Sequence, residues 1–142
     1  MLERIKLSGE LIKFMSLFSS VTRVTARDCI SSESRLIFIV GEGEVGKAIG
    51  KHGANIKQLE QKLKTRVRII EHNPDCIRFI RNAIHPLQVQ RIDEEDGVYS
   101  IVPVDSHTRG MLIGRNAANL REYEAIIKRY FPIRELKVSK VE

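Results

Sequence analysis

The sequence contains no tryptophan, and only 6% of its 142 residues are aromatic. It has two cysteines, Cys29 and Cys76, with neither CxxC spacing nor a histidine cluster beside them. Neither a disulfide framework nor a zinc site is therefore indicated. The four histidines are scattered, and the sequence shows no Ser-His-Asp set or paired carboxylates. We therefore expect no enzymatic activity, no cofactor, no metal site and no small-molecule substrate.

Long hydrophobic runs are also absent. Charged side chains interrupt the first twenty residues, so we expect no signal peptide there. No segment approaches the length of a transmembrane helix. Since 42% of the residues are hydrophobic, the chain can bury a core. These features predict a cytoplasmic protein that does not contact a membrane.

The charge is unevenly distributed. Basic side chains outnumber acidic ones by 24 to 18, which gives a net charge of +6. The first 73 residues hold 13 basic and 8 acidic side chains, and the remainder hold 11 and 10. Between positions 46 and 70 only Glu60 opposes a block of seven cations. The seven are Lys47, Lys51, Lys57, Lys62, Lys64, Arg66 and Arg68. This block predicts an anion-binding site.

The stretch GEGEVGKAIGKHG, residues 41–53, carries five glycines and fits three motifs. Residues 41–46 form the GxGxxG of a dinucleotide-binding turn, and residues 41–47 match most of a Walker A loop. Residues 50–53, GKHG, form a GxxG loop of the kind that grips a nucleic-acid backbone. The three motifs imply different functions.

The sequence contains an internal repeat, which helps to choose among the three motifs. Shifting the chain by 64 positions aligns GKAIGKHGANIKQLE (46–60) with GMLIGRNAANLREYE (110–124), with six identities in fifteen positions. The repeat predicts two copies of a module of about seventy residues. We place the two domains at residues 1–73 and 74–142.

The hydrophobic pattern gives the same element order in each copy, namely helix, strand, strand, helix, helix, strand. In the first copy we expect a helix over 8–19 behind the N-cap Ser8, a β segment over 21–30, a turn over 31–34, a strand over 36–40, helices over 44–50 and 54–64, and a strand over 66–70. In the second we expect a helix from Pro74 to about Pro86, strands over 88–92 and 98–104 around an EEDG turn, a helix over 118–130 and a strand over 133–138.

The repeat favours the third motif. Gly41 and Gly43 correspond to Asp105 and His107, so the second copy loses the first two motifs, whereas Gly114 is kept opposite Gly50. The Walker A match also has Ala48 where a hydroxyl residue belongs. We interpret Gly41 and Gly43 as a strand-to-helix turn that needs positive φ. A small P-loop-like nucleotide-binding protein that uses Gly41–Lys47 stays an alternative.

The GKHG loop also has two interpretations. Gly50 can be a helix C-cap and Gly53 can merely permit a tight turn. However, two short helices meet at this loop, a helix amino terminus follows it, and Lys47, Lys51 and Lys57 surround it. These features attract a phosphodiester backbone, and we favour that function.

The residues resemble the KH nucleic-acid-binding domain. Its pattern I-G-x-x-G-x-x-I-x-x-L runs through Ile49, Gly50, Gly53, Ile56 and Leu59. The element order resembles the type II form, which implies an α/β (α+β) fold of two tandem domains. Each would be an α-β-β-α-α-β unit with a three-stranded mixed sheet and helices on one face. A tandem of such modules is similar to the archaeal NusA-like transcription factors.

The resemblance implies which residues bind RNA. KH domains clamp about four nucleotides between the GxxG loop and an apolar groove. In the first module this implies a backbone clamp of Gly50, Lys51, His52 and Gly53, a groove of Ile49, Ile56 and strand residues such as Val67 or Ile69, and flanking cations Lys47, Lys57, Arg66 and Arg68. The aliphatic side chains of the groove also fit core positions.

In the second module the clamp is Gly114, Arg115, Asn116 and Ala117, followed by Arg121. Ala117 departs from the pattern. Its Cβ either pushes a phosphate away or, in a left-handed backbone, costs about 1 to 2 kcal/mol. We therefore expect a weaker second site. Tyr123, Tyr130 and Phe131 are candidates for base stacking, but Tyr123 occupies the helical position of Leu59, which predicts a core residue.

The function implied is binding of single-stranded RNA across two KH modules in transcription termination or antitermination. RNA polymerase or the elongation complex stays open as a second partner. An RNA-binding factor in ribosome assembly is an alternative, since type II KH domains also occur in ribosomal proteins.

Overall fold

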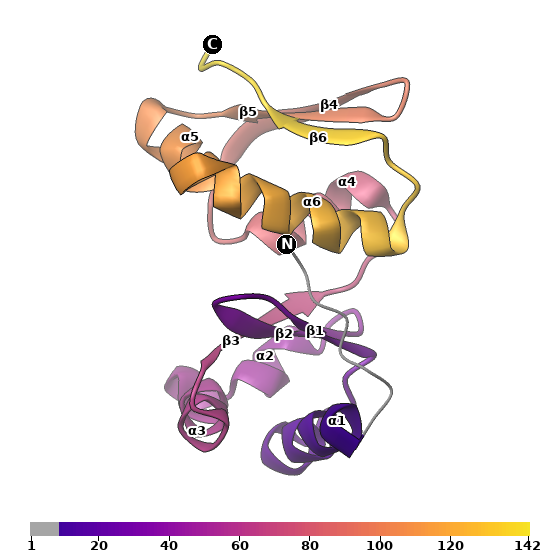
Figure 1. The fold of residues 1–142 in the computed structure, drawn as a ribbon, viewed down its shortest axis with the longest axis vertical. Helices are drawn as coiled ribbons and strands as arrows, with labels where there is room; N and C mark the ends of the chain where they lie inside the picture. Colours follow the sequence, from indigo (N-terminus) through magenta and orange to yellow (C-terminus); the bar gives the residue numbers. More distant parts are fainter. Residues whose placement is uncertain (1–8) are drawn as a thin grey trace. The chain divides into compact units, whose positions relative to one another are not determined.

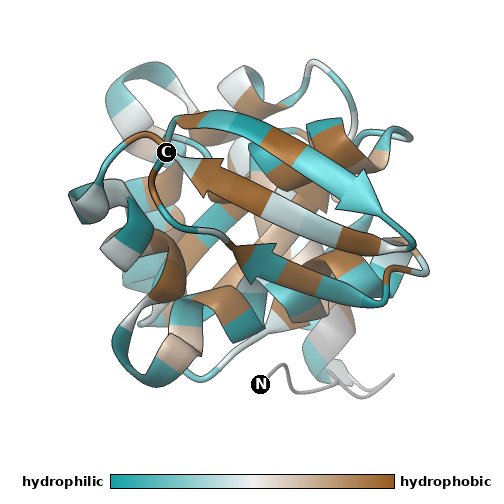
Figure 2. Cartoon of the chain, turned by 90° about the horizontal axis from the view of Figure 1, so that it is seen from above, coloured by the Kyte–Doolittle hydropathy of each residue, from teal (hydrophilic) through white to brown (hydrophobic). Residues whose placement is uncertain are grey.

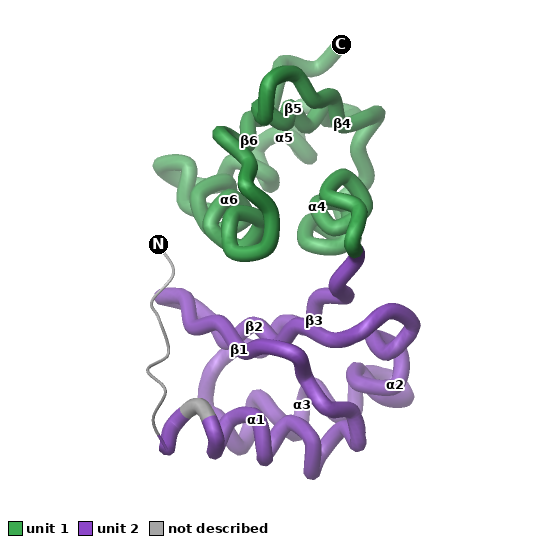
Figure 3. The backbone as a smooth tube through the Cα atoms, turned by 90° about the vertical axis from the view of Figure 1, so that its right-hand side faces the viewer, with its two compact units in different colours: residues 1, 74–142 green, residues 2–73 purple. Residues whose placement is uncertain are grey.

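A computed structural model describes residues 9–142 of the chain. The chain divides into two compact units, one ending at Asn73 and the other beginning at Pro74 (Figure 3). The expected N-cap Ser8 lies outside the described residues.

The first unit contains a three-stranded mixed sheet with helices on one face (Figure 1). Its elements are α1 (Gly9–Thr22), β1 (Asp28–Ser31), β2 (Arg35–Val40), α2 (Val45–Ile49), a 3-10 turn (Lys51–Gly53), α3 (Ala54–Leu63) and β3 (Arg66–Glu71). The strand order is β1-β2-β3, in which β1 is antiparallel and β3 parallel to β2. Because β2 and β3 are parallel, the segment between them crosses over one face of the sheet, and the GKHG loop lies within this crossover.

The apolar face of α1 packs on the sheet of the first unit. The rings of Phe18 and Phe38 stack with centroids 4.4 Å apart, and both side chains are fully buried. Ala48 and Leu59 of α2 and α3 join the same core. Both helices that flank the glycine loop are therefore anchored by core residues.

The second unit repeats this arrangement, with helices on one face of a sheet of order β4-β5-β6 (Figure 1). Its elements are α4 (Cys76–Ile84), β4 (Val89–Glu95), β5 (Val98–Pro103), α5 (Ser106–Ile113), a 3-10 turn (Arg115–Ala117), α6 (Ala118–Tyr130) and β6 (Glu135–Val138). Tyr123 is only 6% exposed, which confirms its core position. Tyr130 and Phe131 pack against the ring of Phe79.

Several predicted boundaries of helices and strands are wrong. Val21 belongs to α1, where we expected a β segment from 21 to 30, and β1 begins only at Asp28. The helix continues because Arg23 N–H bonds to Ser19 O at 2.8 Å, and it ends where Arg23 adopts a φ of 60°. Local helical bonding outweighs the β-branched composition there. In the second unit α4 runs only from Cys76 to Ile84, where we expected a helix from Pro74 to about Pro86, because a proline disfavours the helical conformation in the residue before it, here His85.

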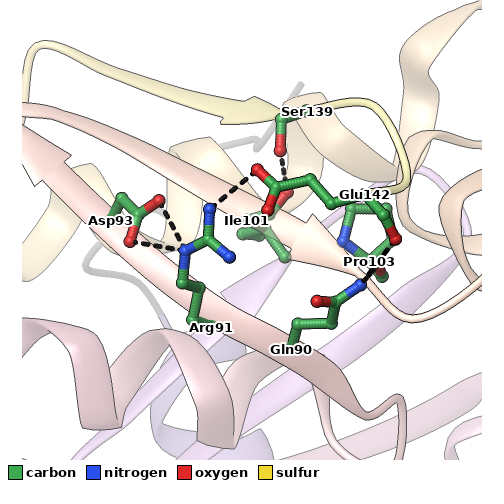
Figure 4. Close-up of polar contacts among 7 residues, drawn as sticks. All are labelled: Gln90, Arg91, Asp93, Ile101, Pro103, Ser139 and Glu142. Atoms are coloured by element: carbon green, nitrogen blue, oxygen red, sulfur yellow. Dashed lines mark hydrogen bonds and ion pairs between the residues drawn. The ribbon is translucent and has the colours of Figure 1, made fainter.

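The second sheet exposes strands that alternate hydrophobic and hydrophilic residues (Figure 2). On its open face the Arg91 guanidinium donates to Asp93 and, at 2.7 Å, to Glu142 Oε2 (Figure 4). Arg91 lowers the pKa of Glu142, and the two carboxylates raise the pKa of Arg91. The hairpin turn consists of Asp96 and Gly97, both at positive φ, so the first two residues of the expected EEDG turn are part of β4.

None of the described helices is long and apolar enough to span a bilayer. Within residues 9–142, no group of three or more histidine, cysteine or acidic side chains is placed to hold a metal ion.

Candidate nucleic-acid interface

The GKHG loop contains a 3-10 turn and three residues at positive φ. Gly50 has φ 81° and ψ 168°, His52 has φ 55° and Gly53 has φ 74°. Gly53 N–H donates to Gly50 O at 3.1 Å and closes the turn. Glycine adopts this φ at position 53 without strain, whereas other L residues are strained there.

The two glycines of the loop differ in their surroundings. A Cβ on Gly50 would lie 2.8 Å from Cγ of Asn55, so a side chain there would collide with the protein. A Cβ on Gly53 would meet nothing within 4 Å. The main chain at Gly53 therefore borders open space, where an external group can approach closely.

The helix that follows the loop has no side-chain cap. The N-cap residue of α3 is Gly53, which has no side chain, whereas α4 and α5 begin at aspartates. Asp75 accepts from Arg78 N–H at 3.0 Å, and Asp105 accepts from Thr108 N–H at 2.7 Å, which lowers the pKa of Asp105. The positive end of the α3 dipole is thus left for an anion from outside the chain.

Three cations of the first module lie around this helix end. Lys47 is on α2, Lys51 is in the loop and Lys57 is in the second turn of α3, and all three are exposed. His52 is exposed as well. The arrangement therefore combines ammonium groups, an open stretch of main chain and a helix amino terminus.

The residues expected to form the groove differ in how deeply they are buried. Ile49 and Ile56 are half-buried and pack against the core while keeping part of their surface exposed. Val67 and Ile69, at 7% and 9% exposure, belong to the core.

The two arginines of β3 lie on the other face of the sheet from the groove residues Val67 and Ile69. Because strand side chains alternate, Arg66 and Arg68 project from the face of β3 opposite to Val67 and Ile69, which pack on the helices. The structure thus brings Lys47, Lys57 and the two isoleucines beside the loop, but not these arginines. Their contact with RNA stays a prediction.

The second loop has the same backbone. Gly114 has φ 74° and ψ 175°, Asn116 has φ 55° and Ala117 has φ 61°. Ala117 N–H donates to Gly114 O at 3.2 Å. Ala117 therefore does sit in the left-handed region, and its methyl group carries the conformational cost expected from the sequence. Arg115 and Arg121 are exposed.

One cation of the first loop has no counterpart in the second. The repeat pairs Lys47 with Met111, whose side chain is 48% exposed. The second loop thus keeps the main-chain geometry but has an apolar side chain where the first has an ammonium group.

The turn before α2 is occupied by an internal carboxylate. Glu44 Oε1 accepts from Gly41 N–H at 2.9 Å, so this amide is not available to a phosphate. Gly43 has φ 80°, which confirms the positive φ expected there. The same expectation for Gly41 is wrong, because Gly41 is not among the glycines at positive φ. The geometry gives no support to a P-loop at residues 41–47.

Sequence reasoning missed two pairs of residues. Asn55 Nδ2 donates to Lys47 O at 3.2 Å, and Asn119 Nδ2 donates to Met111 O at 2.8 Å. Glu60 and Glu124 accept from main-chain N–H groups of β3 and β6. The two asparagines form one of the six identities of the repeat and the two glutamates form another, and that identity was the available signal.

Comparison with known proteins identifies the family. The sequence pattern of the KH domain matches residues 15–90. The chain is 34% identical over 140 residues to a probable transcription termination protein NusA of Methanocaldococcus jannaschii, covering 95% of this chain and 75% of the relative. The protein of the same name from Halococcus morrhuae is 30% identical, with 96% and 99% covered. The chain belongs to the NusA-like KH-domain family.

A solved structure agrees with this membership. The crystal structure of APE1850 matches with a TM-score of 0.73 and 30% identity, covering 94% of this chain and all of that one. The expected α/β fold, with two mixed three-stranded sheets of the tandem type II KH arrangement, is confirmed. The NusA-like KH family is non-enzymatic, which agrees with the expectation from the sequence. A KH domain also implies binding of nucleic acid, RNA in particular.

Proposed function

We propose that this chain binds single-stranded RNA with the main chain of residues 50–53 and acts in the cytoplasm as a transcription termination or antitermination factor. The names of its relatives support a role in termination. RNA polymerase or the elongation complex is the protein partner that such a role implies. Binding needs neither a membrane nor a small-molecule substrate.

One observation carries the RNA-binding part. The helix that starts at Gly53 has no capping side chain, the space beside Gly53 is open, and Lys47, Lys51 and Lys57 are exposed around it. A helix amino terminus without a capping side chain, together with nearby ammonium groups, favours a phosphate. The bases would then lie toward Ile49 and Ile56, whose surfaces are only partly covered.

We propose residues 1–73 and 74–142 as two KH domains of unequal strength. The second loop, Gly114–Ala117, presents a similar backbone, but it adds a methyl group at Ala117 and has Met111 in place of a lysine. Fewer cations and a less open main chain both weaken contact with a phosphate. The first domain therefore provides most of the affinity.

A pair of matched substitutions tests this proposal. Gly53→Asp places a carboxylate at the open position, and aspartate tolerates a left-handed backbone better than most residues do. We expect the Kd for a mixed-sequence single-stranded RNA to rise by roughly 10- to 100-fold through like-charge repulsion. Ala117→Asp should raise it less. Fluorescence anisotropy with a labelled RNA measures both.

Gln61→Asp is the control, because it adds a similar charge at an exposed position near the other end of α3. It should change the Kd by less than about twofold, since exposed charges far from the contact are screened. Equal losses from Gly53→Asp and Ala117→Asp would refute the ranking of the domains. Unchanged affinity in both would refute the loops as the RNA site.

A further inference from the structure

We propose that Asn55 and Asn119 are positioning residues, which hold the two GxxG-type loops in the shape that receives the RNA backbone. Each side chain ties the helix after the loop to the helix before it. The proposal rests on the proposed function, because it assigns the residues that support the same loops. Neither asparagine is placed in contact with RNA.

The geometry is the same in both units. Asn55 is the second residue of α3, and its side-chain amide donates to the carbonyl of Lys47, the third residue of α2, at 3.2 Å. Asn119 donates in the same way to Met111 O at 2.8 Å. Each bond spans the loop and joins residues eight positions apart.

In the first unit the bond supports a short helix, α2. A helix of five residues makes few internal hydrogen bonds and is marginal by itself. Its last carbonyl groups have no partners further along the helix, and they form the negative end of its dipole next to the loop. An amide donor on Lys47 O satisfies one of these carbonyls and so reduces the negative potential where a phosphate would approach.

The loop glycine and the asparagine fit each other. A Cβ on Gly50 would lie 2.8 Å from Cγ and Nδ2 of Asn55, and a Cβ on Gly114 would lie 2.7 Å from Cγ of Asn119. The absent side chain therefore leaves the space that the asparagine fills. Alanine at 55 would remove the donor, and aspartate would place a second acceptor against a carbonyl oxygen.

Comparison of the two copies distinguishes the residues that shape the loop from those that would contact RNA. Between the two copies the three other loop positions change, from Lys51, His52 and Gly53 to Arg115, Asn116 and Ala117. The pair of glycine and asparagine is identical in both. The φ angles of the two loops still agree within about 15° at every position given, well inside the usual scatter of a regular conformation. The elements that both loops share are therefore those that set the shape.

The test compares Asn55→Ala with Gln58→Ala, which removes an exposed side-chain amide from the same helix. Asn55→Ala should raise the Kd for the labelled mixed-sequence RNA by about tenfold, the effect of losing one net hydrogen bond from the preorganised loop. The slope of log affinity against log salt should stay unchanged, since no phosphate contact is removed. Gln58→Ala should leave the Kd within about twofold.

A second measurement needs no RNA. In the free protein, NMR amide signals of residues 51–53 should broaden or average in Asn55→Ala but not in Gln58→Ala, while core amides of α3 and β3 keep their wild-type shifts. The same should hold for residues 115–117 in Asn119→Ala. A role only in overall stability would instead lower the melting temperature and leave the loop signals unchanged.

The outcomes are separable from those of the proposed function. If Gly53→Asp abolishes binding while Asn55→Ala matches its control in affinity and in loop signals, the positioning role is wrong and the RNA site stands. If Asn55→Ala unfolds the unit, the residue is a stability residue and the proposal is overturned. If Gly53→Asp has no effect, the proposed site itself fails, whereas the NMR comparison still decides the positioning role.

Discussion

At the scale of single residues, Gly53 and Ala117 are the informative pair, because the same left-handed backbone is built with two different amino acids. Their φ angles are 74° and 61°. Glycine adopts this conformation without cost, whereas alanine is strained by about 1 to 2 kcal/mol. The second loop keeps its shape in spite of this strain, so the rest of the unit must hold it there.

Replacing Ala117 with glycine should therefore stabilise the second unit. We expect Ala117→Gly to raise the free energy of unfolding by about 1 kcal/mol, through relief of the left-handed strain. Urea unfolding monitored by circular dichroism measures the change.

The control is the neighbouring alanine, Ala118, which has a regular helical φ of −61°. Ala118→Gly should lower the free energy of unfolding by roughly 0.5 to 1 kcal/mol, because glycine disfavours a helix. A loss of stability in Ala117→Gly would show that its backbone is not strained.

The sequence predicted the loop but not the residues that support it. Gly50 and Gly53 follow from a motif, and the repeat made Ala117 a visible departure. Asn55 was not predictable in the same way, since a polar residue in the first turn of a helix usually faces solvent. Its bond reaches Lys47 across a turn whose direction the hydrophobic pattern does not specify.

At the scale of elements, one side-chain bond in each unit connects the helix after the loop to the last strand. Glu60 Oε2 accepts from Val67 N–H at 3.0 Å, and Glu124 Oε2 accepts from Leu136 N–H at 2.9 Å. In each case the amide belongs to the second residue of the strand. The bond fixes α3 against β3 and α6 against β6, and so limits movement between helix and sheet.

We expect Glu60→Ala to lower the free energy of unfolding of the first unit by about 1 to 3 kcal/mol, as for loss of a hydrogen bond to a charged group. The amide of Val67 should also exchange with solvent faster. Hydrogen exchange followed by NMR measures both the global and the local effect.

Gln61→Ala, at the next and exposed position of α3, is the matched control and should stay within about 0.5 kcal/mol of the wild type. If Glu60→Ala behaves like this control, the bond contributes nothing measurable to the unit.

The order of the elements was predictable because each unit alternates strong hydrophobic runs with turn residues. The first and last residues of each element were less predictable. Val21 is β-branched, yet α1 continues past it, and the carbonyls of Phe18 and Ser19 accept from the Thr22 hydroxyl and the Arg23 N–H. The hydrophobic pattern predicts that the final strand of the second unit starts at 133, whereas β6 begins at Glu135. Strand ends depend on pairing with β5, which is long-range information.

At the scale of the whole molecule, the two units have the same fold but different net charges. The excess of cations lies in the first 73 residues, where the open loop is also found. The second unit carries acidic residues on the β4–β5 hairpin, namely Asp93, Glu94, Glu95 and Asp96. RNA affinity should therefore depend on salt mainly through the first unit.

The salt dependence gives a quantitative prediction. Log affinity for single-stranded RNA should fall with log salt by about 0.7 for each phosphate engaged. Lys57→Ala should reduce this slope by about 0.7, since it removes one cation beside the loop. Binding curves at several salt concentrations measure the slope.

Lys137→Ala removes the same charge from an exposed position on β6 and should leave the slope unchanged. Equal slopes in the wild type and Lys57→Ala would mean that this lysine is only a solvated side chain.

The helices that follow the two loops, α3 and α6, differ in length, and the difference lies at their C-terminal ends. The helix has 10 residues in the first unit and 13 in the second, yet the segment from the loop to the strand-anchoring glutamate has kept its length. Additions have thus accumulated at the far end of the helix. A designer who wishes to insert a tag or a sensor peptide into this scaffold should choose that end, where the second unit holds three more residues than the first and the loop keeps the same backbone.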